Sequence, residues 1–110
     1  VETALANMKS RAQALGVGIL IAVLPRRDQV DGSTPETAYN TRIAQIARRL
    51  EIPTVDLLEP LRRAWPEHGT ALFIPWDGHD SSLANEVIAH ELAGPVRALA
   101  ARPDDPTTRP

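Results

Sequence analysis

The sequence contains no cysteine, and this absence excludes several kinds of site. Without thiols the chain has no disulfide framework, no cysteine nucleophile and no zinc site with cysteine ligands. The absence of cysteine also means that disulfides give no indication of the cellular compartment. Aromatic residues are also scarce, at 4%, whereas hydrophobic residues make up 43% of the 110 residues. We therefore expect one small globular domain with an aliphatic core rather than a disordered or fibrous chain.

Strong net charge and long apolar runs are absent as well. Twelve basic residues against fourteen acidic ones give a formal net charge of −2, which provides no basic surface for nucleic acid or an anionic membrane. The longest apolar stretch runs from about Gly18 to Pro25, far short of the roughly 20 residues that cross a bilayer. We expect no membrane span and find no pattern typical of a signal segment. Because the chain opens at Val1 inside a helical pattern, without an initiator methionine, we expect it to be a fragment.

The first part of the chain changes from a helical to an extended pattern. Apolar residues recur at three- and four-residue steps from Glu2 to Leu15, which predicts a helix that ends in a left-handed Gly16. The stretch Gly18–Leu24 is apolar on both alternating faces and predicts a strand covered by helices on both sides. A polar loop, Arg26–Ser33, should follow at the carboxyl end of this strand.

The middle of the chain predicts a helix and a second strand. Thr34, with a proline and a glutamate after it, is typical of a helix start, and the helix should run to Leu50. We expect it to bury one stripe of residues: Tyr39, Ile43, Ile46, Ala47 and Leu50. Residues 52–55 predict the second strand, and Asp56 should cap a brief helix that ends near Ala64, before a break at Trp65–Gly69.

The last part predicts one long helix. Ala71–Ile74 suggests a third, short extended segment, followed by a turn at Pro75–His79. Ser81 or Ser82 should cap a helix that reaches about Leu99 and is bent or interrupted at Gly94–Pro95. Residues 102–110, rich in proline and aspartate, predict a disordered tail.

This order of helices and strands predicts an α/β fold. The helix between the two strands is long enough for a right-handed crossover, so we expect the strand within Gly18–Leu24 to pair in parallel with the strand at residues 52–55. A complete doubly wound sheet carries about five strands. Residues 1–101 provide only two to three strands, so we expect them to be one part of a larger domain. The sheet should then be covered by a missing N-terminal half or by another chain.

The turn Asp77-Gly78-His79 is the strongest candidate for chemistry. Ligands of open α/β sheets bind at the carboxyl ends of the strands, where this turn should lie. A general-base histidine needs a partner that accepts its Nδ1–H while Nε2 faces the nucleophile, and Asp77 is close enough in sequence to be that partner. The same residues also fit an ordinary turn, since Asp-Gly is a common turn dipeptide.

Other candidates are weaker. Asp77, His79 and Asp80 could together bind a divalent metal, but no fourth ligand stands at useful spacing, so we expect neither metal nor cofactor. Arg26 and Arg27 could contact an anionic group of a substrate or simply form a solvated loop.

Three segments of the chain resemble the C-terminal half of the SGNH/GDSL hydrolase family of esterases and lipases. They are the strand and polar loop at Leu20–Val30, the segment Ile52–Leu57 after a helix, and Leu72–His79 before the terminal helix. The resemblance implies a partial flavodoxin-like three-layer αβα fold with a parallel sheet. It also implies that Asp77 and His79 belong to a Ser-His-Asp triad, although the family's commonest spacing has two residues between them rather than one.

The same resemblance places the other catalytic groups outside this chain. The family's blocks with the nucleophilic serine and with the oxyanion-hole glycine and asparagine have no counterpart here and would lie upstream of Val1. The leading hypothesis is therefore the C-terminal part of a serine esterase that acts on an ester or an acylated small molecule or carbohydrate. A periplasmic or secreted parent would fit the family. The alternative hypothesis is a non-catalytic α/β module that packs against a partner.

Overall fold

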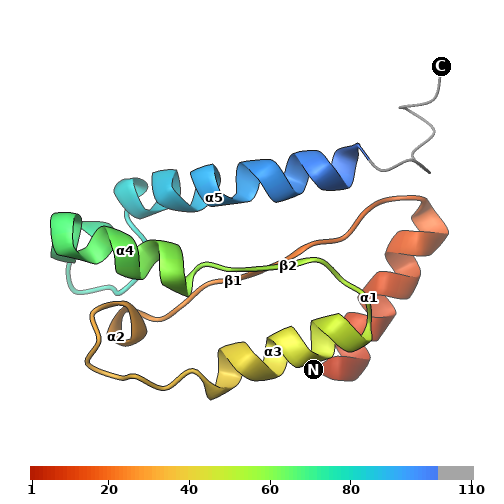
Figure 1. Cartoon of the computed structure of the whole chain (residues 1–110), viewed down its shortest axis with the longest axis horizontal. Coiled ribbons are helices and arrows are strands. Elements are labelled where there is room, and N and C mark those ends of the chain that lie inside the picture. The colour runs from red at the N-terminus through yellow and green to blue at the C-terminus, as the bar shows by residue number, and fades with distance from the viewer. Residues whose placement is uncertain (102–110) are drawn as a thin grey trace.

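Two short parallel strands lie between helices at the centre of the chain (Figure 1). The computed structural model describes residues 1–101, so the tail expected over residues 102–110 lies outside the described residues. Strand β1 (Ile21–Val23) pairs in parallel with β2 (Thr54–Asp56), with Ala22 opposite Val55. The predicted parallel pairing is confirmed, and the fold is mixed α/β and mostly helical.

Helices flank the strands on two sides (Figure 1). On one side lie α1 (Glu2–Leu15) and α3 (Ala38–Arg49), and on the other lie α4 (Leu58–His68) and α5 (Ser82–Ala100). The short helix α2 (Arg27–Val30) follows β1 within the segment expected to be a loop. None of the helices in the described part of the chain is long and apolar enough to cross a bilayer.

The first helix and its end agree with the prediction, but the strand after it is shorter than Gly18–Leu24. Gly16 adopts the left-handed conformation, with φ 69° and ψ 26°. Strand β1 begins only at Ile21, whose N–H donates to the carbonyl of Pro53 at 2.9 Å. Because a proline has no N–H, Pro53 cannot donate the next ladder bond back toward Ile19, and the pairing ends there.

Helix α3 starts later than predicted, and it buries Ile43, Ile46 and Ala47 of the predicted stripe but not Tyr39. The segment from Thr34 to Thr37 is not helical, because the side-chain amide of Gln29 donates to the carbonyl of Glu36 at 2.8 Å and the Glu36 carboxylate accepts the N–H of Ala38. The helix therefore begins at Ala38. Tyr39, expected in the core, is 62% exposed, and the neighbouring Asn40 is buried instead.

The segments after β2 also differ from the prediction. Helix α4 continues through Trp65 and Pro66 to His68, because a proline near the end of a helix removes only one backbone donor. The expected extended segment at Ala71–Ile74 is mostly a 3₁₀ helix, η1 (Gly69–Leu72), after which only Phe73 forms an isolated antiparallel bridge, to Asp80.

The cap of α5 is confirmed and the expected interruption is wrong. The Ser81 hydroxyl oxygen accepts the N–H of Ala84 at 3.3 Å. The helix continues from Ser82 to Ala100 without a break at Pro95, which removes one donor and leaves the helical bonds on either side.

The main hydrophobic core lies where α2, α4, η1 and α5 meet. Its buried members come from all four elements: Val30, Leu58, Leu61, Leu72, Phe73 and Ala84. Leu61 and Leu72 have no exposed surface. Because Leu72 and Phe73 immediately precede the turn that carries Asp77 and His79, this core anchors one end of the candidate site.

Candidate active site

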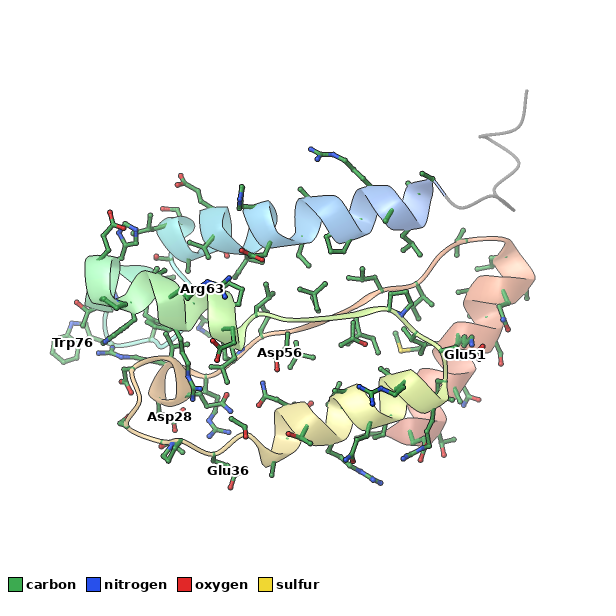
Figure 2. The ribbon with its side chains drawn as sticks, viewed as in Figure 1. Asp28, Glu36, Glu51, Asp56, Arg63 and Trp76 are labelled. Atoms are coloured by element: carbon green, nitrogen blue, oxygen red, sulfur yellow. The ribbon has the colours of Figure 1, made fainter. Side chains whose placement is uncertain are left out.

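The turn at Pro75–Asp77 is closed by backbone hydrogen bonds on both sides. Ile74 donates its N–H to the carbonyl of His79 at 2.8 Å, and the N–H of Asp77 donates back to the carbonyl of Ile74 at 3.2 Å. Trp76 and Gly78 are both in the left-handed region, with φ of 68° and 79°. Trp76 lies at the tip of the turn and projects away from the molecule (Figure 2). The turn is thus a tight loop between η1 and α5.

Within this turn the side chains of Asp77 and His79 contact each other. His79 Nδ1 lies against Asp77 Oδ1, and the imidazole is 81% exposed. Because Nδ1 faces the carboxylate, Nε2 is the nitrogen left to exchange a proton with another group. The hydrogen bond to Asp77, and secondly its negative charge, raise the pKa of His79 above its ordinary value near 6.5.

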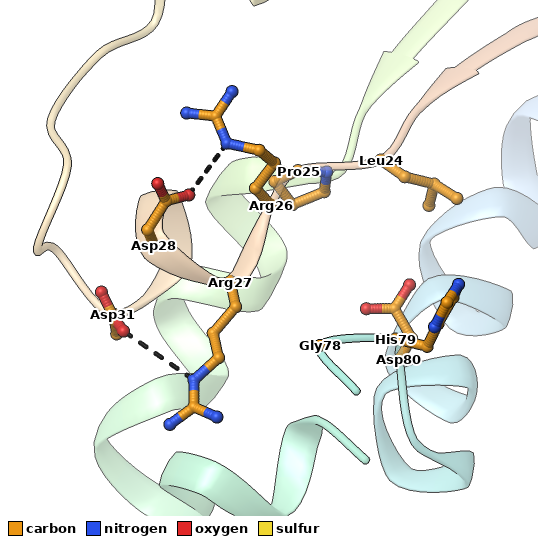
Figure 3. Close-up of a pocket in the computed structure, with 9 residues that line it drawn as sticks. All are labelled: Leu24, Pro25, Arg26, Arg27, Asp28, Asp31, Gly78, His79 and Asp80. Atoms are coloured by element: carbon orange, nitrogen blue, oxygen red, sulfur yellow. Dashed lines mark hydrogen bonds and ion pairs between the residues drawn. The ribbon is translucent and has the colours of Figure 1, made fainter. Parts of the chain in front are cut away.

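A cleft of about 680 Å³ joins this turn to the carboxyl end of β1 (Figure 3). One side is formed by Gly78, His79 and Asp80, and the other by the residues at the end of β1 and in and after α2: Leu24, Pro25, Arg26, Arg27, Asp28 and Asp31. The structure therefore places the candidate histidine where ligands of open α/β sheets bind.

The charged residues across the cleft are paired with one another. Arg26 Nε lies 3.0 Å from Asp28 Oδ1, and this hydrogen bond is the main cause of the lowered pKa of Asp28. Arg27 Nε lies 4.0 Å from Asp31 Oδ2, and its guanidinium carbon lies 5.9 Å from the centre of the Phe73 ring. The wall opposite His79 thus contributes oriented ion pairs to the cleft rather than isolated positive charges.

A buried polar network behind this wall is missing from the sequence-based prediction. The side chain of Gln29 donates to Asn40 Oδ1 at 3.0 Å, and Asn40 Nδ2 donates to Asp56 Oδ1 at 3.2 Å. Asp56 also accepts the N–H of Leu58 at 3.0 Å, but the N-cap of α4 is Leu57, one residue after the predicted Asp56. The network ties α2 to α3 and to the end of β2. Asn40 could have been found, because it stands three residues before Ile43 on the buried stripe.

Two serines of the described residues, Ser33 and Ser81, are engaged in local structure. Ser81 Oγ donates to the carbonyl of Ala71 at 2.6 Å in addition to capping α5. Ser33 Oγ donates to Asp31 Oδ1 at 2.5 Å. No hydrogen bond between residues 1–101 joins a serine hydroxyl to His79, so the described residues bring together only the histidine and the aspartate of the expected triad.

The neighbouring carboxylate, Asp80, has a different environment from Asp77. It is partly buried, and this loss of solvation raises its pKa above the ordinary value. Within residues 1–101, no three histidine, aspartate or glutamate side chains are grouped so that they could hold a metal ion. Asp80 is therefore part of the cleft wall and a second negative charge near the imidazole.

The contact of His79 with Asp77 predicts that two aspartate variants will lower the pKa of His79 by different amounts. Asp77→Asn should lower the pKa of His79 clearly, because it removes the main cause of the raised value, and Asp80→Asn should lower it less, because that residue acts only through its charge. An NMR titration of the His79 ring protons measures both. Equal shifts in the two variants, or an unchanged pKa in Asp77→Asn, would show that the contact does not govern the imidazole.

Comparisons of the chain with protein-family models, with curated protein sequences and with solved structures gave no match.

Proposed function

We propose that this chain carries the histidine and aspartate of a serine ester hydrolase site. His79 is the general base and then the general acid, Asp77 orients it, and the nucleophilic serine comes from residues outside these 110. The observation that supports the proposal is the contact of His79 Nδ1 with Asp77 Oδ1 beside a cleft at the carboxyl end of β1. The two strands then belong to a larger, flavodoxin-like three-layer sheet.

The proposed chemistry proceeds in two proton transfers through His79. The serine oxygen attacks the carbonyl carbon of the ester while His79 Nε2 takes the hydroxyl proton, and the carbon–oxygen π bond becomes an oxyanion. When that intermediate collapses, the bond to the alcohol breaks and Nε2 returns the proton to the leaving oxygen. Water then releases the acid by the same steps. Asp77 keeps the imidazole in the required tautomer and stabilises its positive charge.

The residues that line the cleft indicate which class of substrate it could bind. Its aliphatic part, Leu24 and Pro25, lies at the end of β1, and its polar part contains paired arginines and aspartates together with Asp80. Such a lining suits a neutral ester whose alcohol carries hydroxyl groups, because paired charges accept and donate hydrogen bonds without demanding a charged ligand. We propose an acylated small molecule or carbohydrate as the substrate.

One observation favours the second candidate, a non-catalytic module that packs against a partner. Large apolar side chains are exposed around β1, Leu24 and Val17 among them. In that case Asp77-Gly78-His79 is an ordinary turn, and neither His79 nor Asp77 takes part in chemistry.

A serine-directed fluorophosphonate distinguishes the two candidates. The 110-residue chain alone should show neither ester hydrolysis nor labelling of Ser10, Ser33, Ser81 or Ser82, because no hydrogen bond within residues 1–101 joins any of these serines to His79. The protein encoded by the complete reading frame should be labelled at a serine outside Val1–Pro110, and His79→Ala should abolish that labelling.

The controls separate chemistry from folding. His90→Ala, a change on the exposed side of α5, should leave labelling intact. An unlabelled but folded product of the complete frame would refute the hydrolase proposal and favour the packing module. Labelling of Ser81 or Ser82 in the chain alone, dependent on His79, would refute the assignment of the nucleophile to other residues.

A further inference from the structure

A second cavity, of about 340 Å³, lies at the carboxyl end of β2, between α3 and α4. It is separate from the cleft that contains His79, because the two share no lining residue. Its walls come from the start of α3, from Asp56 at the end of β2 and from the first turns of α4. Small-molecule sites have volumes of about 300–1,000 Å³, and ligands of open α/β sheets bind at the carboxyl ends of the strands. The cavity therefore has the size and the place of a small ligand site.

Asp56 is held at this cavity by neutral hydrogen-bond donors. Its Oδ1 accepts the N–H of Leu58 at 3.0 Å and Asn40 Nδ2 at 3.2 Å, whereas among residues 1–101 its Oδ2 accepts only Asn40 Nδ2, at 3.3 Å. Asn40 is 5% exposed and its side-chain oxygen accepts from Gln29, which orients its amide toward Asp56. Figure 2 shows Asp56 projecting from the strands toward α3. The carboxylate therefore has a fixed position and a free lone pair on Oδ2.

The negative charge of Asp56 is not compensated within the described part of the chain. No lysine, arginine or histidine of residues 1–101 forms an ion pair with this carboxylate. The other charged residues of the cavity are Glu59 and Arg62, whose side chains lie 3.8 Å apart, and Arg62 Nε donates to the carbonyl of Gln29 at 3.0 Å. The lining therefore carries one excess negative charge, which repels an anionic ligand and attracts a cationic one.

The uncharged part of the lining limits the size and the polarity of such a cation. Ala44 and Leu58 contribute aliphatic side chains, and Thr37 and Thr41 each carry a methyl group beside a hydroxyl. This surface suits an aliphatic ligand body better than a chain of charged groups. An ammonium on that body would form a charge-assisted hydrogen bond with a carboxylate, which is roughly twice as strong as a neutral one.

We propose that the cavity between α3 and α4 binds a small protonated amine, whose ammonium donates a hydrogen bond to Asp56 Oδ2 while its aliphatic part contacts Ala44 and Leu58. The two hydrogen bonds that Oδ1 accepts leave Oδ2 as the oxygen that receives the ligand. Binding of the amine needs neither His79 nor a nucleophilic serine. Its test can therefore succeed or fail independently of the proposed hydrolase function.

The test compares two probes of nearly the same shape, cyclohexylamine and cyclohexanol, at neutral pH, where the amine is protonated. Each probe is titrated into the 110-residue chain labelled with ¹⁵N, and NMR follows the backbone amides and the Asn40 side-chain amide. We expect cyclohexylamine to bind about tenfold or more tightly than cyclohexanol, because only the ammonium forms a charge-assisted hydrogen bond. The shifts should centre on Asn40, Thr41 and Leu58 rather than on Gly78 and His79.

Matched variants give the test its controls. Asp56→Asn removes the charge but keeps the shape and an acceptor for the Leu58 N–H, so it should abolish the preference for the amine. Glu86→Gln removes the same charge from an exposed residue of α5, outside the cavity, and should bind both probes as the wild type does. Ala44→Leu, at an exposed position of α3, fills part of the cavity and should weaken binding of both probes. Circular dichroism shows which variants are folded, and Ala44→Leu tests the site even where Asp56→Asn does not fold.

Three results would overturn the proposal. Equal binding of cyclohexylamine and cyclohexanol would show that the cavity does not select a cation. A preference for the amine that persists in folded Asp56→Asn, or that Glu86→Gln also removes, would show that the chain attracts cations through its overall charge. Absence of shifts at Asn40, Thr41 and Leu58 with either probe, or binding that Ala44→Leu leaves unchanged, would show that the cavity is not the binding site.

Discussion

His79→Ala should lower kcat for a small activated ester by about a thousandfold or more in the protein encoded by the complete reading frame. In the proposed mechanism no other group removes the proton of the serine, so the remaining rate would come from the oxyanion site and substrate binding alone. KM should change little, because the exposed imidazole provides little ground-state binding. Steady-state kinetics with 4-nitrophenyl acetate measures both constants, and His90→Ala is the matched control.

The pH profile adds a second readout for the same residue. A general base must be neutral, so kcat/KM should rise with pH and reach half its maximum at the pKa of His79, above the ordinary value near 6.5. Asp77→Asn should move this midpoint to lower pH while it also lowers the maximal rate, because an amide does not hold the imidazole in the required tautomer. An unchanged rate in His79→Ala would refute the catalytic role.

The contact of His79 with Asp77 also predicts a small effect on stability, with a definite sign. A histidine whose pKa is raised on folding stabilises the folded state below its unfolded pKa, and this contribution disappears as the pH rises through the folded pKa. The effect should therefore be present in mildly acidic solution and absent in alkaline solution. Because the imidazole is exposed, this effect on stability should be smaller than the effect of His79 on the reaction rate.

The features that the sequence predicts correctly follow from caps, turns and the order of apolar segments, all of which can be seen in the chain itself. The left-handed Gly16 and the Ser81 cap depend on residues within one helical turn of each helix end. Parallel pairing of β1 with β2 follows from a crossover helix between two apolar segments. The contact of Asp77 with His79 has a similar local cause, because only Gly78 separates them.

The features that the sequence does not predict depend on particular side-chain contacts that no periodic pattern or capping motif encodes. Nothing near Thr34 indicates that Gln29 will hold the carbonyl of Glu36 and delay the start of α3. Likewise, the Asn40 side chain can be buried only because Gln29 and Asp56 both form hydrogen bonds with its amide. A buried amide without such hydrogen-bond partners would be destabilising. The cleft itself depends on where α2 comes to lie relative to the turn at Pro75–Asp77, which local sequence does not determine.

Leu61→Ala should have the largest effect on stability, about 2–5 kcal/mol in the free energy of unfolding. The Leu61 side chain has no exposed surface and belongs to the core formed by α2, α4, η1 and α5, so its removal leaves a cavity. The matched control is Leu24→Ala, which removes the same atoms from a side chain that is 56% exposed. Leu24→Ala should lower the free energy of unfolding by well under half as much as Leu61→Ala does. Urea unfolding followed by circular dichroism measures this free energy for both variants.

The same substitution also tests whether this core positions the candidate site. Leu72 and Phe73, which pack in the Leu61 cluster, lead directly into the turn that holds Asp77 against His79. A cavity at Leu61 should loosen this turn, so the pKa of His79 should fall toward its ordinary value in folded Leu61→Ala and stay raised in Leu24→Ala. Equal losses of stability in the two variants would mean that the core does not lie at α4. An unchanged His79 pKa in Leu61→Ala would show that the backbone hydrogen bonds between Ile74, Asp77 and His79 hold the turn without support from the core.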